Sequence, residues 1–284
     1  HMAAETPPWA AQQYAQLLDS YTPAAVTHRT LLAVAVDTRR LRSGGSLRSR
    51  GLAASLIELG QEMAGLQTSL RSAGLTVESW LPPERLAAVV RNAYASDAAR
   101  LLEGAGGIAG RLGSAGPLAV TEHWSYLRHD SGYSTVMWVS EWPRVDVPAH
   151  FLHGVVFIPG VRKTLSITAA PLSTATAMRD IRKAKVAHLI DATERAKIGA
   201  IADLSDNAAY DDVLEREQAL VAGHADYRFT GLVTITADAL VELSDAVAAV
   251  TRAAVGCGCE TRVLFGQQAR AFTAAALPLA RRVS

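Results

Sequence analysis

The stretch from Ala225 to Pro278 constrains the fold most, because strand and helix signals alternate there within a short length. Aromatic, aliphatic and β-branched residues dominate positions 227–235, which predicts a strand that Gly231 interrupts. Positions 263–265 predict a second, shorter strand. Between the two, aliphatic residues recur at spacings of three and four, which predicts a helix with one apolar face. These residues are Leu240, Leu243, Val247 and Val250.

Asp238 and Gly256 stand where this helix is expected to begin and end, as an N-cap residue and a C-terminal glycine. We therefore expect a strand–helix–strand unit whose two strands are parallel neighbours joined by a right-handed crossover. Within this unit we expect Ile235 to be buried in a central strand, with Leu243 on the helix packed over it.

The rest of the chain predicts an α+β fold. Apolar residues on both faces of residues 27–40 predict a central strand, and the turn residues at 129–132 predict a β-hairpin. Helices are expected over residues 47–72, 83–94, 149–157 and 211–221, with a strand over 162–170 and a long helical region after Pro171. This order predicts two layers: a mixed sheet with helices mostly on one face, and ferredoxin-like elements.

The expected organisation is a leader or linker over residues 1–25 and a single α+β domain over 26–284. A division of that domain into two halves, joined by the glycine-rich loop at 104–116, stays open. The glycines of this loop lack the G-x-G-x-x-G spacing of a phosphate-binding loop. His1 and Met2 are typical of a cloning remnant, so we expect the natural protein to be longer.

Composition argues against several classes of protein, although a local basic patch that contacts nucleic acid stays open. The net charge of +1 gives no overall field that would attract nucleic acid, and two cysteines are too few for a disulfide framework. The longest uncharged runs, 147–161 and 164–178, are shorter than the ~20 residues that span a membrane. The G-x-x-x-x-G-K-[ST] loop that cradles nucleotide phosphates is absent from the sequence, so we expect no ATPase activity and no cofactor.

Short motifs in a fixed order carry a resemblance to a known family. They are WVSEWPR at 138–144, VPAHF at 147–151, PLSTATA at 171–177, EREQALVAGHA at 215–225, GLVTIT at 231–236 and GQQARAFTAAALP at 266–278. In this order they resemble the N-terminal, non-motor domain of type IV secretion and conjugative-transfer ATPases. The chain most resembles an actinobacterial membrane-anchored family that carries only this domain.

The resemblance implies a non-enzymatic assembly or docking subunit, a scaffold for conjugative DNA transfer. Its implied partners are a secretion or transfer ATPase and other apparatus subunits, and it would form an oligomer or act alone. It would lie at the cytoplasmic face of the cell membrane, attached through a segment outside this sequence. The alternative is the soluble domain of a type VII secretion membrane-complex subunit.

Partner-binding residues are expected in two places. Trp138 and Trp142 lie near a predicted strand end, where they form either core or a protein–protein hot spot. Gln267, Gln268 and Phe272 lie in the segment that follows the last strand; the alternative is that Phe272 closes the core.

Other polar residues carry weaker signals. We expect His123, His129 and Asp130 to be solvated hairpin residues rather than an acid–base site. His150 and His153 share a predicted helix face, but no third ligand is evident, so no metal site is expected. A basic strip predicts a solvated helix face, or else a contact with a partner or with nucleic acid. It comprises Arg179, Arg182, Lys183 and Lys185.

Overall fold

The computed structural model describes residues 28–36, 52–95, 112–130, 132–198 and 204–281. The chain divides into two compact units, His1–Ala33 and Val34–Ser284, and each is described by itself. The described part of the first unit, residues 28–33, contains no helix or strand. All the elements below belong to the second unit.

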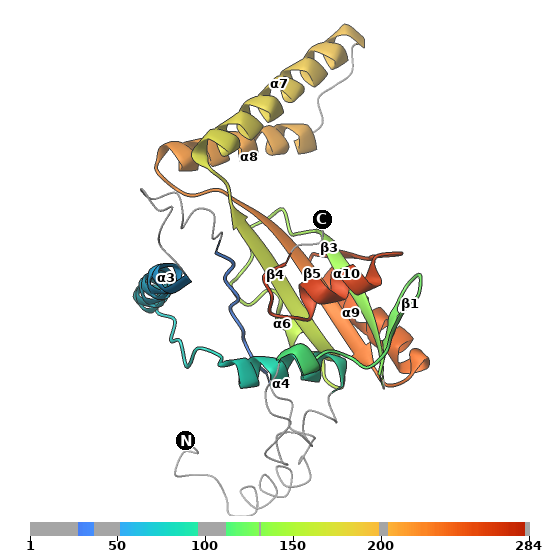
Figure 1. The fold of residues 1–284 in the computed structure, drawn as a ribbon. Coiled ribbons are helices and arrows are strands. Elements are labelled where there is room, and N and C mark those ends of the chain that lie inside the picture. The colour runs from blue at the N-terminus through green and yellow to red at the C-terminus, as the bar shows by residue number, and fades with distance from the viewer. Residues whose placement is uncertain (1–27, 37–51, 96–111, 131, 199–203, 282–284) are drawn as a thin grey trace, which may run out of the picture. The chain divides into compact units, whose positions relative to one another are not determined.

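A six-stranded sheet organises the second unit (Figure 1). Its main path runs β1 (Val120–Glu122), β2 (Leu127–His129), β3 (Gly132–Glu141), β5 (Tyr227–Ala237) and β4 (Arg162–Pro171). A sixth strand, β6 (Glu260–Val263), pairs with β3. Every pairing among these strands is antiparallel, so the expected mixed sheet is corrected to an antiparallel one.

Within the described ranges, seven α-helices accompany the sheet: α3 (Leu52–Ser72), α4 (Pro83–Tyr94), α6 (His153–Val156), α7 (Thr174–Ile198), α8 (Leu204–Val221), α9 (Leu240–Gly256) and α10 (Gln268–Ala275). A short 3-10 helix, η1, spans Leu112–Ser114. The α+β class expected from the sequence is thereby confirmed.

Helices cover both faces of the sheet, which corrects the expectation of two layers with helices mostly on one face. On one face, α4 and α10 bury their apolar residues against β2, β3 and β5, in a core centred on Phe272 and Val136. On the other, α9 and α6 pack over β3, β5 and β6, with Ile235 and Leu243 together in a second core. The predicted contact between Ile235 and the helix that carries Leu243 is confirmed.

The predicted strand–helix–strand unit exists as β5, α9 and β6, but its strands are not neighbours. Both pair antiparallel with β3, on its two opposite edges, so β5 and β6 run parallel with β3 between them. The helix begins at Leu240 after Ala239, without a side-chain cap from Asp238. After its end, the left-handed backbone is at Gly258, with φ +73°, rather than at Gly256.

The predicted hairpin at 129–132 is confirmed as the β2–β3 turn. Asp130 holds this turn with φ +34°, and its Oδ1 accepts the backbone N–H groups of Leu118 (2.7 Å) and Ala119 (3.1 Å). Its other oxygen forms an ion pair with Arg91 of α4 at 3.0 Å. Asp130 is therefore a structural anchor between the hairpin and α4, not a solvated turn residue.

A side chain completes one edge of β3. Along that edge β2 pairs with residues up to Ser134 and β6 begins at Met137, which leaves Val136 between them. The Gln268 amide lies at this gap: its Oε1 accepts the Val136 N–H at 2.8 Å, and its Nε2 donates to Leu264 C=O at 2.8 Å. Gln268 thus supplies the hydrogen bond that a neighbouring strand would otherwise give.

The strand expected over 27–40 is absent from its described part. Residues 28–36 form no strand, and apolar residues of this segment are exposed, Leu32 and Val34 among them. Residues 27 and 37–40 lie outside the described residues, as do the whole leader expected at 1–25 and residues 104–111 of the glycine-rich loop expected at 104–116. The boundary between the two compact units lies after Ala33.

Two long helices, α7 and α8, lie side by side (Figure 1). Ala177, Ile181 and Leu220 form a small core between them, separate from the two cores of the sheet. Farther along, Lys185 pairs with Glu217, and the rings of His188 and Tyr210 stack with centroids 4.4 Å apart. One side of α7 therefore packs against α8.

Candidate docking surface

An exposed tryptophan lies on the turn that joins β1 to β2. The Trp124 side chain is 72% exposed and stacks on Phe265, which is 51% exposed and follows β6; the ring centroids are 6.0 Å apart, with 19° between the planes. Tryptophan is usually largely buried, and when exposed it is enriched among residues that dominate protein–protein binding. The pair is a candidate anchor for a partner.

The backbone is built to hold this pair in place. Gly266 donates its N–H to the Trp124 C=O at 2.8 Å and has φ +68°. A Cβ on Gly266 would lie 2.9 Å from the Trp124 ring, so only glycine fits here. Glu122 adds a second tie, because its Oε1 accepts the backbone N–H of Ala269 in the first turn of α10 at 2.9 Å.

Two more residues extend this surface. His123 is exposed and stacks on Tyr126 within the same turn, with centroids 4.4 Å apart. Gln267 is exposed and directly follows Gly266. We call the set His123, Trp124, Phe265 and Gln267 the aromatic turn surface. It contains no carboxylate, lysine or arginine and bears two large apolar rings, as the centre of a protein interface does.

The structure separates the five predicted partner-binding residues. Gln267 is exposed in the aromatic turn surface, and Trp138 is 39% exposed on β3. Gln268 and Phe272 are fully buried, so both predictions are corrected: the first completes the β3 edge and the second fills the core. For Phe272, burial supports the alternative weighed from the sequence.

Trp142 is half-buried and has a structural role. Its ring lies against Gly231 so closely that a Cβ there would come within 2.4 Å of it. The rings of Phe151 and Phe229 contact it edge-on, at centroid distances of 6.4 and 5.6 Å. Trp142 therefore packs directly on Gly231, the residue that interrupts the strand pattern in the sequence.

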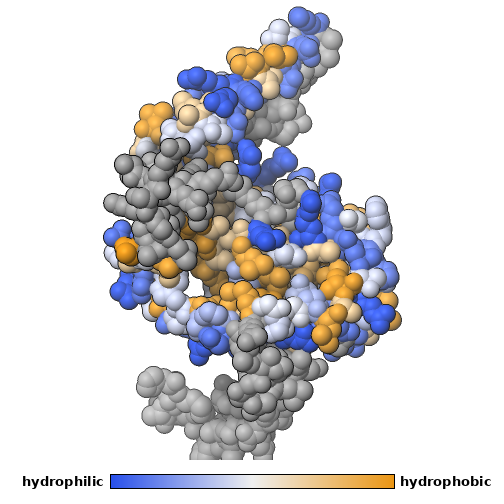
Figure 2. Space-filling view, in the orientation of Figure 1, coloured by the Kyte–Doolittle hydropathy of each residue, from blue (hydrophilic) through white to orange (hydrophobic). Residues whose placement is uncertain are grey.

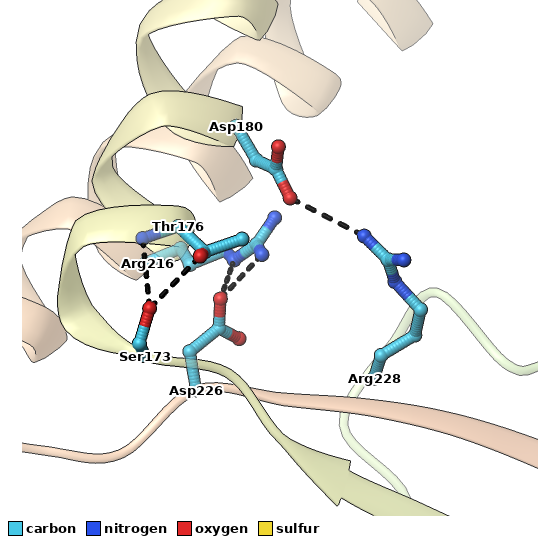
Figure 3. A network of polar contacts seen from close by, with 6 residues as sticks. All are labelled: Ser173, Thr176, Asp180, Arg216, Asp226 and Arg228. Carbon is cyan, nitrogen blue, oxygen red and sulfur yellow. Dashed lines mark hydrogen bonds and ion pairs between the residues drawn. The ribbon is translucent and has the colours of Figure 1, made fainter.

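A polar hollow lies where α7 and α8 join the sheet (Figure 3). Its volume is about 490 Å³, and Tyr227 and Phe229 contribute to its lining. The residues drawn there are Ser173, Thr176, Asp180, Arg216, Asp226 and Arg228.

Each charge in this hollow already has a partner. Arg216 binds the Asp226 carboxylate through two nitrogens, and Arg228 contacts Asp180 at 3.3 Å. Ser173 Oγ accepts the Thr176 N–H at 3.3 Å, which caps α7. Because the arginines and aspartates are matched in number, the hollow offers no excess charge to a ligand, and we interpret the network as a structural junction.

A buried polar chain has the residue types of a nucleophilic site without access for a substrate. His129 Nε2 and Ser134 Oγ are 2.7 Å apart, and Ser134 Oγ lies 2.7 Å from Thr236 Oγ1. All three side chains are buried, and the Tyr94 and Phe272 rings pack against His129. Burial lowers the pKa of His129, and the Tyr94 backbone carbonyl raises it by a smaller amount. These three hydrogen-bonded side chains stabilise the core, and a substrate in solvent has no access to them in this conformation.

Other sequence signals lead to no site. Among the described residues, no group of three or more histidine, cysteine or acidic side chains is placed to hold a metal ion. Within the same ranges, no helix has both the length and the apolar character needed to cross a bilayer. Of the predicted basic strip, Lys185 is paired with Glu217, whereas Arg179, Arg182 and Lys183 are exposed on α7.

Comparison with known proteins gives no match to any family model and no match to any curated protein. The resemblance to transfer-ATPase domains therefore stays an expectation from the sequence.

The sequence reasoning missed the aromatic turn surface. It assigned no partner-binding role to Trp124 and placed Phe265 within the strand predicted at 263–265. The available signal was Gly266 directly after Phe265, since a glycine at a strand end favours a left-handed turn, but this signal does not indicate the contact with Trp124.

Proposed function

We propose that this chain is a non-enzymatic docking subunit of a conjugative DNA-transfer apparatus of the type IV kind, and that it binds a transfer ATPase through the aromatic turn surface. The observation that carries the proposal is the exposed Trp124–Phe265 pair, held by the backbone at Gly266. The order of sequence motifs that resembles the transfer-ATPase domain supports the class of partner. Attachment at the cytoplasmic face of the membrane belongs to the same proposal.

Binding to the ATPase encoded nearest to this chain in its genome tests the proposal. Biolayer interferometry would compare the wild type with Trp124→Ala, and with Trp80→Ala as a matched control at another exposed tryptophan. We expect Trp124→Ala to weaken binding by at least about tenfold, as loss of a hot-spot tryptophan does, and Trp80→Ala to have little effect.

Two outcomes would contradict the docking proposal: no binding by the wild type, or equal loss of binding with both variants. Capture of type VII secretion components in place of the ATPase would support the alternative system. Calorimetry with ATP and magnesium tests the non-enzymatic part, since a micromolar dissociation constant would overturn it.

A further inference from the structure

The side of α7 that points away from α8 carries an apolar stripe. Val186, Leu189 and Ile190 are 54%, 59% and 53% exposed, whereas Ile181 and His188 face α8. The spacings of three and four place these three aliphatic residues on one side of the helix. Together with Thr193, Glu194 and Lys197 they line a shallow hollow of about 340 Å³.

Within the part of the chain that the structure describes, no apolar cluster covers this stripe. The three side chains contribute to none of the described cores, and apolar residues grouped on the surface of a helix typically mark an interaction site. Figure 2 shows apolar side chains at the surface of the α7–α8 pair. The stripe therefore needs an occupant with a complementary apolar face.

The charges at its two ends indicate which occupant. Lys183 and Glu194 are about three helical turns apart on the same flank of the stripe, one at each end. Neither has an ion-pair partner among the residues that the structure describes. We call Lys183, Val186, Leu189, Ile190 and Glu194 the outer face of α7. The positive charge of Lys183 and the negative charge of Glu194 lie at about equal distances on either side of the centre of this face, which is near position 188.

Self-complementarity follows from this symmetry. In an antiparallel pair of helices related by a two-fold axis, each flank meets the same flank of the other copy. Lys183 then lies opposite Glu194 of the second copy, and Val186 lies opposite Ile190, each contact occurring twice. Leu189, closest to the axis, meets its own counterpart. In a parallel two-fold pair each flank instead meets the opposite flank of the other copy, so Lys183 and Glu194 would lie across the seam from their counterparts and would not pair.

We propose that the outer face of α7 binds a second copy of this chain, antiparallel and two-fold symmetric. This interface is separate from the aromatic turn surface and does not depend on the proposed partner. Arg179 and Lys197 also meet across the pair, and their like charges weaken it. The small apolar area and this repulsion give a weak association, with a dissociation constant above about ten micromolar.

Charge reversals on the outer face test both the contact and its direction. Sedimentation equilibrium, from about ten micromolar to about one millimolar protein, would compare the wild type with Lys183→Glu, Glu194→Lys and the double variant. Each single change turns two attractive pairs into two repulsive ones, so we expect about tenfold weaker association. The double variant exchanges the charges and should return to within about threefold of the wild type. Lys197→Glu should strengthen association, because it then faces Arg179.

A second pair of variants tests the apolar contact. Val186→Asp should abolish association, whereas Val241→Asp, at a more exposed valine on α9, should not change it. Circular dichroism would check that α7 remains folded. The proposal is overturned if the wild type stays monomeric at about one millimolar, if the double variant associates as weakly as the single ones, or if Val186→Asp leaves association unchanged.

Discussion

The two faces of the sheet are both covered by helices, but their cores contain different kinds of side chain. Under α9, the core is filled mainly by aliphatic side chains, such as Ile235, Leu243 and Val250. Under α4 and α10, apolar residues surround buried polar groups, with His129 bonded to Ser134, and Gln268 bonded to the β3 backbone. Burial of aliphatic side chains dominates the first face, where Thr135 donates one hydrogen bond to the Ser125 carbonyl. The second face depends more on specific partners, because a buried polar group without one is costly.

This contrast predicts which residues can be exchanged. Aliphatic cores tolerate substitutions that conserve volume, since dispersion and burial depend weakly on atom type. Buried hydrogen bonds tolerate them poorly, because the group left behind keeps its desolvation cost. The predictions below separate loss of volume, which should act on both faces, from loss of a partner, which should act only on the second.

Phe272→Ala should have the largest effect. Its ring is fully buried against Tyr94 and His129, so truncation removes apolar burial and leaves a cavity in the polar face. We expect a loss of about 3–5 kcal/mol in the free energy of unfolding, measured by denaturant titration. A loss under about 1 kcal/mol would mean that α10 does not pack on this face in solution.

Leu243→Ala should destabilise the aliphatic face by a similar or smaller amount. Leu243 is buried in the core that contains Ile235, and we expect a loss of about 2–5 kcal/mol, from lost burial and a cavity. The neighbouring exposed valine supplies a control, since Val241→Ala should change stability by less than about 0.5 kcal/mol. Equal effects of the two changes would show that the helix face is assigned wrongly.

Predictability from the sequence differs between the faces in the same way. The apolar periodicity of residues 240–250 was enough to place α9 and to pair Leu243 with Ile235, because burial follows a repeating pattern. The position of β3 between β5 and β6 was missed, since pairing depends on contacts between residues far apart in the chain. Gln268 carries no local signal at all: its role depends on a gap between two other strands.

The candidate site was predicted less well than the fold. Aromatic residues drew attention to Trp138 and Phe272, yet composition cannot tell a buried ring from an exposed one. The exposed pair at Trp124 and Phe265 arises where two separate turns meet, so only the tertiary structure reveals it.

Gln268→Met should have an intermediate effect. Methionine is unbranched and of similar length, so it keeps the volume, while the Val136 N–H loses its acceptor. We expect a loss of about 1–3 kcal/mol, the cost of an unsatisfied buried donor. Hydrogen exchange gives an independent readout, because the Val136 amide should exchange faster than that of Ile235 on the neighbouring strand. Unchanged stability together with unchanged exchange would show that the amide does not complete the strand edge.

The smallest effect should be confined to acid pH and to the polar face. Burial lowers the pKa of His129 below its ordinary value of 6.5, so the folded chain favours the neutral ring. Below pH 6.5 the unfolded chain binds a proton that the folded chain resists, and stability should fall until the pH has passed the folded pKa. Because other titratable groups of the chain also respond to acid, the comparison requires a variant that removes only the histidine. In His129→Phe the ring still packs against Tyr94 and Phe272, and Ser134 keeps its bond to Thr236.

Denaturant titrations of the wild type and His129→Phe from about pH 8 to about pH 5 should give a difference in the free energy of unfolding that moves in favour of the variant as the pH falls. A difference that stays constant over this range would mean that the ring is not buried in its neutral form, and that the polar face lacks the partner chemistry that distinguishes it from the aliphatic one.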